Sequence, residues 1–153
     1  MLQKLIRTDD DLGAFLARLG LGAVMLTHGT QKVFAYGIGG TVQMFQQYFH
    51  LPAAVTLLVI AVEFLGSIGL ILGLLGRVAA LGTAANMLGA VLLVHLQVGF
   101  FMNWNRVADR GEGYEYHILA IALALIVMVK GSGRWSVDRA LSQQGFPQPE
   151  RRA

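Results

Sequence analysis

The 153-residue sequence has no cysteine and few charged side chains. Without cysteine the chain forms no disulfide and no thiolate metal site, and it performs no thiol chemistry of its own. Charged residues make up 14% and hydrophobic residues 55% of the chain, whereas a soluble domain carries about 25% charge. The basic residues form no patch interleaved with aromatics, which argues against nucleic-acid binding despite a net charge of +3. This composition indicates a single membrane-embedded domain.

One acid, Glu63, lies inside a long apolar run. Residues 53–75 contain no other charge, and as a helix they span about 34 Å, enough to cross a bilayer core of about 30 Å. A carboxylate at that depth costs about 2.5–3.5 kcal/mol. Glu63 is therefore expected to have a partner or a function.

The apolar pattern predicts an all-α, polytopic membrane protein, a four-helix bundle. The spans are expected at about 11–32, 53–75, 78–98 and 114–130, in one domain over residues 1–141, with a polar C-terminal tail over 142–153. The fourth apolar stretch is short, about 21 Å as a helix, so the span must begin at Tyr114 or Glu115. Aspartates 9–11 precede the first span where a signal peptide would be cationic, and they indicate a helix N-cap instead.

The distribution of Lys and Arg predicts that both termini are cytoplasmic. Most basic residues fall on one side of the expected bundle, in the N-terminal tail, in the turn between the second and third spans, and in the C-terminal tail. These residues are Lys4, Arg7, Arg77, Lys130, Arg134, Arg139, Arg151 and Arg152.

Three polar residues are expected to meet in the bilayer. Measured along the helices from the inner boundary, Arg18 lies about 10 Å, Asn86 about 13 Å and Glu63 about 18 Å deep, and an arginine side chain can cover the difference. Small residues flank each of them and favour close helix approach. Two interpretations stay open: an ion pair that fixes helix register, or a proton relay or ligand anchor formed by Glu63 and Arg18.

A second polar group is expected near the outer face, where the sequence places His28, Gln31, Lys32, His95, Glu115 and His117. Imidazoles bind transition metals, but the spacing shows no metal-ligand motif, and Glu115 and His117 should point in opposite directions on a helix. His95 should project about 180° away from Asn86. We predict no metal site. The histidines are expected either to contact lipid headgroups or to line a site for an amphipathic ligand such as a quinone.

The connecting segments are expected to cover this outer face. Val42, Phe45 and Phe49 recur at helical spacing and predict a short amphipathic helix before Pro52. The aromatic segment 99–104 is typical of an interfacial loop. Together they could roof a cavity.

Several motifs in this order resemble the DoxX family of small bacterial and archaeal membrane proteins. They are Arg18, the block 26–34 with His28, Gln31 and Lys32, the block 63–66 with Glu63, Gly69 and residues 73–77, Asn86-Met87, His95, residues 99–101, the block 113–116 with Glu115, and residues 133–138. The resemblance covers roughly residues 12–141. It implies a multi-pass protein of the bacterial or archaeal cytoplasmic (inner) membrane, of a kind associated with membrane oxidoreductase complexes.

The leading hypothesis is therefore a quinone-interacting subunit of a membrane oxidoreductase system. Catalytic roles are expected for Glu63 and Arg18, and ligand contacts for His28, Gln31, Lys32, Asn86, His95 and Glu115. The chain has no Gly-x-Gly-x-x-Gly motif and no cysteine, so electrons would come from a redox-enzyme partner. Alternatives are a non-catalytic membrane scaffold or anchor for such a partner, or a small transporter. Homo-oligomerisation through the glycines at 66, 69 and 73 also stays open.

Overall fold

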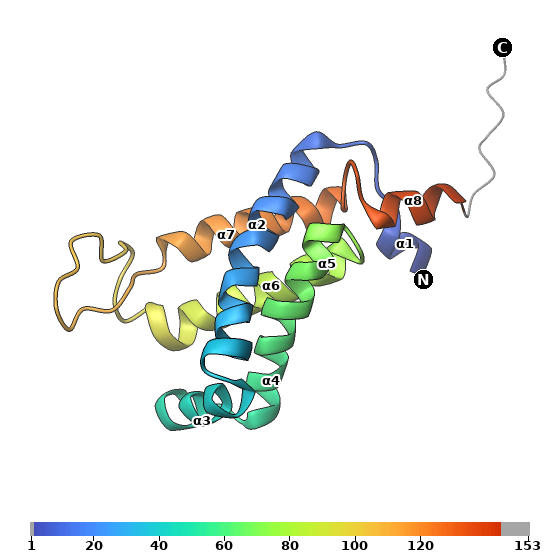
Figure 1. Cartoon of the computed structure of the whole chain (residues 1–153). Helices are drawn as coiled ribbons and strands as arrows, with labels where there is room; N and C mark the ends of the chain where they lie inside the picture. Colours follow the sequence, from blue (N-terminus) through green and yellow to red (C-terminus); the bar gives the residue numbers. More distant parts are fainter. Residues whose placement is uncertain (1, 145–153) are drawn as a thin grey trace, which may run out of the picture.

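The computed structural model describes residues 2–144, and all regular secondary structure in that range is helical. Wider π-helical turns, η1 (Gln31–Ala35), η2 (Val62–Gly66) and η3 (Val91–His95), follow α2, α4 and α6 respectively. The predicted all-α class is confirmed. The predicted polar tail begins inside the last helix, and the rest of it, with Arg151 and Arg152, lies outside the described residues. In chain order the α-helices are α1 (Leu2–Ile6), α2 (Leu12–Thr30), α3 (Ile38–Phe49), α4 (Ala53–Ala61), α5 (Ser67–Leu72), α6 (Gly76–Ala90), α7 (Glu115–Lys130) and α8 (Val137–Gln144) (Figure 1).

Within residues 2–144, three helices are long and apolar enough to cross a membrane: Leu12–Ala35, Ala53–Leu72 and Gly76–His95. They coincide with the first three expected spans, because the helical backbone continues through each π turn. α7 has 16 residues, which is about 24 Å of helix and shorter than the other three. Asp11 caps α2 as expected, since its carboxylate accepts a hydrogen bond from the Ala14 amide at 2.9 Å.

The core between the helices consists largely of small and flexible side chains, while many long apolar side chains point outward. This distribution is typical of helices that pack closely on one another and face lipid on the outside. One close approach of two helices involves Gly29, where a Cβ would lie 2.6 Å from the Glu63 carbonyl carbon. The core residues are Ala17, Leu21, Met25, Leu70, Ala80, Met87, Ala120, Ala124 and Val127.

Both ends of the described chain lie at one end of the molecule, where α1 packs on α8 (Figure 1). We call this the closed end. The α5–α6 turn lies here, with Gly73 and Leu75 in left-handed conformations (φ 67° and 50°). Asp138 accepts hydrogen bonds from the Leu75 amide at 2.8 Å and the Gly76 amide at 3.0 Å. A carboxylate at the N-terminus of α6 satisfies free amides and complements the helix dipole.

The surface of the closed end carries an ion-pair cluster around Asp10. Arg134 and Arg139 donate to its carboxylate at 2.7 and 2.9 Å. The hydrogen bond from Arg134 is the main cause that holds the pKa of Asp10 below its ordinary value. Asp10 is therefore charged at neutral pH and joins the chain before α2 to the segment that enters α8.

From the closed end, two pairs of helices diverge (Figure 1). In one pair α2 packs along α5 and η2, and in the other α6 packs along α7. α3, predicted as an amphipathic helix, lies across the far ends of η1 and α4. A loop over residues 96–114 joins η3 to α7 at the far end of the second pair. The candidate site lies between the pairs.

Candidate functional site

The π turns hold four of the polar side chains singled out from the sequence: Gln31 and Lys32 in η1, Glu63 in η2 and His95 in η3. A π turn is a rare local widening of a helix and is frequent at functional sites. Each apolar helix therefore departs from regular geometry where it carries one of these polar groups.

Glu63 is buried, with 5% of its surface exposed, and both of its carboxylate oxygens are hydrogen-bonded. Lys32 Nζ donates to Oε2 at 2.5 Å, and Asn86 Nδ2 donates to Oε1 at 2.9 Å. The negative charge is thus paired and solvated by side chains from two other helices, as a buried carboxylate requires. The predicted contact between Glu63 and Asn86 is confirmed.

The predicted ion pair between Arg18 and Glu63 is wrong. Arg18 is fully buried at the closed end, and within the described residues 2–144 all of its side-chain hydrogen bonds go to backbone oxygens. It donates to the carbonyls of Leu70, Ile71, Ser132, Arg134 and Trp135, at distances from 2.6 to 3.1 Å.

Free carbonyls explain why Arg18 turns toward the closed end. The last carbonyls of a helix have no intrahelical donor, and α5 ends at Leu72 next to the turn over residues 131–136. A guanidinium offers five donors in a fixed fork, which suits several converging acceptors. Depth along the helix axis showed that Arg18 could reach Glu63, but it gave no information about these competing acceptors.

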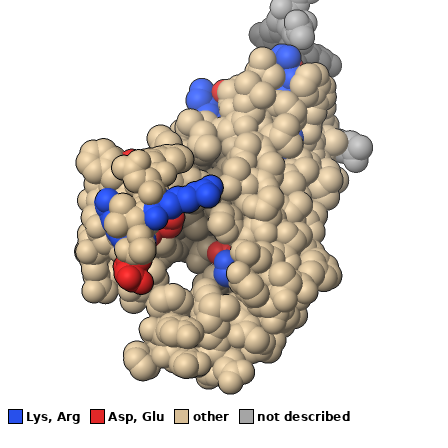
Figure 2. All heavy atoms as spheres, turned by 60° about the vertical axis from the view of Figure 1, so that its left-hand side comes forward, with Lys and Arg blue, Asp and Glu red and all other residues tan. Residues whose placement is uncertain are grey.

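A cavity of ≈ 1010 Å³ lies between the two helix pairs, and Figure 2 shows its opening, with charged side chains inside it and at its rim. Its wall is apolar over most of its extent, with contributions from α3, α4, α6 and η3. Polar groups come mainly from α2, η1, η2, α6, η3 and the start of α7. They are His28, Gln31, Lys32, Glu63, Asn86, His95, Tyr116 and His117.

Glu115 is the one expected ligand contact that the structure places away from this cavity. It accepts a hydrogen bond from Trp104 Nε1 at 2.8 Å, in the loop before α7. Its position agrees with the expectation that Glu115 and His117 point in different directions from α7. Glu115 therefore fastens the loop to the start of α7.

Two aromatic side chains of α7, Tyr116 and His117, line the cavity. Sequence reasoning placed His117 in the outer polar group without naming it as a ligand contact, and it did not identify Tyr116. With His28 and His95 they form a row of rings, with centroid distances of 6.5 Å (His28–Tyr116), 5.4 Å (Tyr116–His117) and 4.2 Å (His117–His95). Tyr116 Oη and His117 Nδ1 are buried and have no hydrogen-bond partner among residues 2–144. Such atoms are costly unless something outside the chain satisfies them.

A signal for His117 was present in the sequence. His117 stands three, seven and ten residues before Ala120, Ala124 and Val127, which form the buried face of α7. That helical spacing places His117 on the inward face.

His95 also lies differently from expectation. His95 is nine residues after Asn86, and in a regular α-helix the two side chains would point about 180° apart. Both nevertheless line the cavity. The wider turn η3 lies between them and changes the register. The His95 ring is held by a hydrogen bond between Nδ1 and the Glu112 carbonyl at 2.8 Å, so Nδ1 carries the proton and Nε2 is the free acceptor when the ring is neutral.

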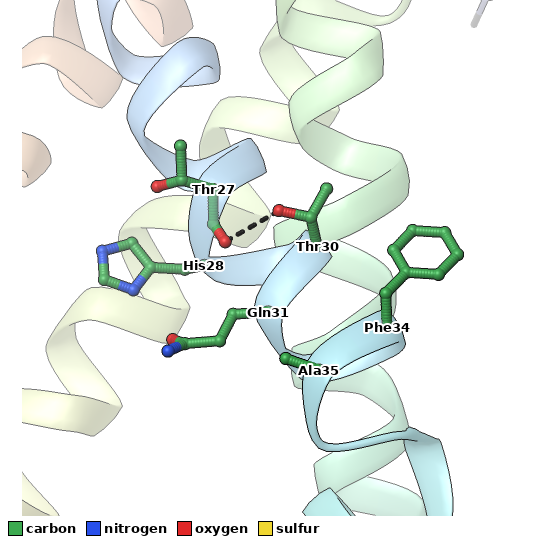
Figure 3. A pocket seen from close by; sticks show the side chains of 6 residues that line it. All are labelled: Thr27, His28, Thr30, Gln31, Phe34 and Ala35. Carbon is green, nitrogen blue, oxygen red and sulfur yellow. Dashed lines mark hydrogen bonds between the residues drawn. The ribbon is translucent and has the colours of Figure 1, made fainter.

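A smaller hollow of ≈ 500 Å³ lies along the same stretch of α2 and η1 (Figure 3). His28 and Gln31 line both this hollow and the large cavity. Their side chains project to one side of the helix, and Phe34 projects to the other. His28 and Gln31 thus form part of the boundary between the large cavity and the outer surface of α2.

The helices and the polar cavity define a small multi-helical membrane protein, and comparison with known proteins agrees. The DoxX family model matches residues 13–96, so the chain belongs to the DoxX family of membrane proteins. The matched region runs from α2 through η3 and contains Lys32, Glu63 and Asn86. Tyr116 and His117 lie beyond it.

Three curated relatives are similar to this chain. "Inner membrane protein YqjF" of Escherichia coli is 27% identical over 135 residues, 88% of this chain and 96% of that protein. "Uncharacterized membrane protein Rv3486" of Mycobacterium tuberculosis is 29% identical over 146 residues, 92% of this chain and 88% of that protein. "Putative oxidoreductase CatD" of Bacillus subtilis is 29% identical over 93 residues, 61% of this chain and 67% of that protein. No solved structure matches the chain.

Proposed function

We propose that the protein crosses a bacterial or archaeal cytoplasmic membrane four times, as one domain over residues 1–141, with α7 as the fourth span. α7 packs along α2 and α6, and its small-residue face is buried. Basic residues gather at the closed end, where Arg77 donates to the carbonyls of Leu5 and Met128 and Lys130 pairs with Asp11. The positive-inside rule places this end, and both termini, in the cytoplasm.

We infer that the large cavity binds a lipid-soluble ring with polar oxygens, such as a quinone. The observation that carries this inference is the triad Lys32–Glu63–Asn86 in the wall of a largely apolar cavity. Lys32 and Asn86 are donors suited to a ring carbonyl, and the apolar wall suits the remainder of the molecule. Tyr116 and His117 add polar atoms that lack a hydrogen-bond partner among residues 2–144.

In this proposal the chain is a quinone-interacting subunit of an oxidoreductase system. Reduction of a quinone to a quinol takes up two electrons and two protons. The electrons come from a redox-enzyme partner, which fits the oxidoreductase name of the relative CatD. Glu63 relays the two protons one after the other: its carboxylate, which lies between a cationic and a neutral donor and faces the cavity, takes up each proton from water and passes it to a quinone oxygen. Arg18 stabilises the fold of the closed end and takes no part in proton transfer.

The test is to replace Glu63 by Gln and measure bound quinone and quinone-dependent turnover. Gln keeps the shape and removes both the charge and the proton-exchanging group. We expect about one quinone per wild-type chain in an organic extract analysed by mass spectrometry, and a Glu63→Gln protein that folds but has lost turnover. Bound quinone should fall about tenfold, because the Lys32–carboxylate pair that orients the donors is gone.

Glu115→Gln is the matched control, since it removes a carboxylate outside the cavity and should change neither readout. An unrelated helical membrane protein purified in the same detergent gives the background. Quinone at background in the wild type, or full turnover in Glu63→Gln, would contradict the proposal. Background quinone in a wild-type protein that co-purifies with a redox enzyme would favour the scaffold alternative.

A further inference from the structure

We propose that the ligand is a membrane lipid with a long apolar chain, which enters the cavity sideways from the bilayer and leaves its chain in the cleft between α4 and η3. This inference rests on the proposed function and adds the substrate class and the entry route. It separates a tailed quinone or quinol from a small water-soluble ring that would reach the same polar groups.

The cleft follows from the way the helices cross. Gly82 of α6 lies against η2, since a Cβ at this position would be 3.1 Å from Val62 Cγ2. Beyond this crossing the two helix pairs diverge toward α3 and the loop before α7 (Figure 1). The cavity therefore widens from η2 outward, and its opening is visible on one face of the molecule (Figure 2).

The polarity of the walls sets the orientation of the ligand. At the narrow end, next to η2, the wall holds Lys32, Glu63 and Asn86. Along the cleft, α4 contributes Val55, Leu58 and Val59, and η3 contributes Leu93 and Val94, with no polar side chain among these residues. A polar ring fits the narrow end, and an attached hydrocarbon chain can stay in an apolar environment all the way to the lipid.

Two residues of the cleft walls line the cavity and are also exposed on the outer surface of the molecule. Leu58 is 64% and Leu93 is 51% exposed, and both line the cavity. Their sequence neighbours Leu57 and Leu92 are 47% and 58% exposed but do not line it. In the proposed route the hydrocarbon chain passes between Leu58 and Leu93, on the flank of the apolar helices, while Leu57 and Leu92 lie outside the cavity wall.

α3 covers the cavity at the far ends of η1 and α4. The Thr41 hydroxyl lies 3.0 Å from the carbonyl oxygens of both Lys32 and Gly37 and shares its one hydrogen between them, which fixes α3 across the end of η1. Phe45 and Phe49 of α3 pack edge to face at 5.3 Å and line the cavity. Access along the helix axes meets this aromatic cover, whereas access from the flank meets flexible leucine side chains.

The experiment compares a tailed and a tail-less probe on four tryptophan variants. Purified full-length protein in mild detergent is equilibrated with ubiquinone-10 or with ubiquinone-0, which has the same ring and no isoprenoid chain. Bound quinone per chain is measured by mass spectrometry. The variants are Leu58→Trp and Leu93→Trp in the cleft, with Leu57→Trp and Leu92→Trp as controls of the same size change on the same turns.

We expect Leu58→Trp and Leu93→Trp to weaken ubiquinone-10 binding about tenfold, since each indole occupies the path of the chain. Ubiquinone-0 binding should stay within about twofold of wild type. Both controls should match the wild type with both probes. Thermal unfolding in detergent verifies that all four variants fold.

Wild-type binding of both probes with no loss of ubiquinone-10 in the cleft variants would overturn the side entry while the proposed function stands. Equal losses of both probes in the cleft variants would also overturn it, because the substitutions would then weaken binding of the quinone ring itself and not of its chain. Failure of the wild type to bind either probe would overturn the proposed function and this inference with it.

Discussion

Charged side chains are buried in two regions of this protein, and their bonding partners differ between the two regions. At the closed end, the Arg18 guanidinium is bonded to backbone carbonyls, and Asp138 accepts from two amides and from the Ser132 hydroxyl. Between the helix pairs, Glu63 is bonded to two side chains and lies in the wall of a large cavity. The charges at the closed end are bonded mainly to backbone groups, whereas Glu63 is bonded to side chains and borders the cavity.

The difference shows how a charge inside a membrane protein can be assigned a role. Backbone partners belong to helix ends and turns, so a charge that binds them fixes the geometry of the chain. Side-chain partners can exchange protons and release a bond to a ligand without unfolding a helix. The depth of a charge in the bilayer alone does not separate the two cases, as Arg18 and Glu63 demonstrate.

The largest effect is expected from Arg18→Leu. The substitution leaves several buried carbonyls without donors, each at a cost of about 1–3 kcal/mol, so the expected loss of stability is above about 3 kcal/mol. We expect little folded protein, or a strongly lowered Tm in detergent by circular dichroism. Arg18→Lys should recover only part of the loss, because an ammonium offers fewer donors. A stable Arg18→Leu protein would contradict the structural role assigned to Arg18.

A double-mutant cycle on the triad should give a different pattern. Lys32→Met leaves the buried Glu63 carboxylate with one donor, and breaking a buried pair in this way costs about 3–5 kcal/mol. Lys32→Met combined with Glu63→Gln removes both charges, so Tm should return to near the wild-type value while quinone binding stays lost. Recovery of stability without recovery of binding would separate a functional pair from a structural one. If the double variant stays as unstable as Lys32→Met, the triad stabilises the fold.

The smallest effect concerns the approach of α2 to η2. In Gly29→Ala the added Cβ meets the backbone of Glu63, and the helices must separate, which costs about 1–3 kcal/mol. Gly20→Ala on the same helix has nothing within 4 Å and should keep or raise Tm, since alanine is the better helix former. Both Tm and bound quinone should fall in Gly29→Ala only. Equal behaviour of the two variants would show that this close approach is not needed for the site.

Much of the fold was predictable because membrane helices leave strong signals. The apolar runs gave the first three spans, aspartates 9–11 were identified as a cap that the structure assigns to Asp11, and the spacing of Val42, Phe45 and Phe49 predicted α3. Within the site, the contact between Glu63 and Asn86 followed from similar depths and small neighbouring residues. These features depend on length and periodicity, which the sequence carries locally.

The rest depended on local geometry that periodicity does not encode. Arg18 was assigned to Glu63 because the free carbonyls at the end of α5 and in the turn before α8 depend on the tertiary arrangement. His95 was placed on the wrong face because a regular turn was assumed where η3 lies. Lys32 was expected near the outer face and not beside Glu63, although the distance is within reach of its long side chain.

The π turns have a consequence for the way related sequences should be aligned. Each turn holds one residue more than a regular helical turn would. Deletion of a single residue within 31–35, 62–66 or 91–95 would restore a regular helix and rotate everything beyond it by about 100°. In an alignment, a one-residue gap at one of these turns would therefore indicate a regular helix whose residues beyond the gap face another direction. The three turns are the places where deletion of one residue would change the geometry of the site while the helix itself survives.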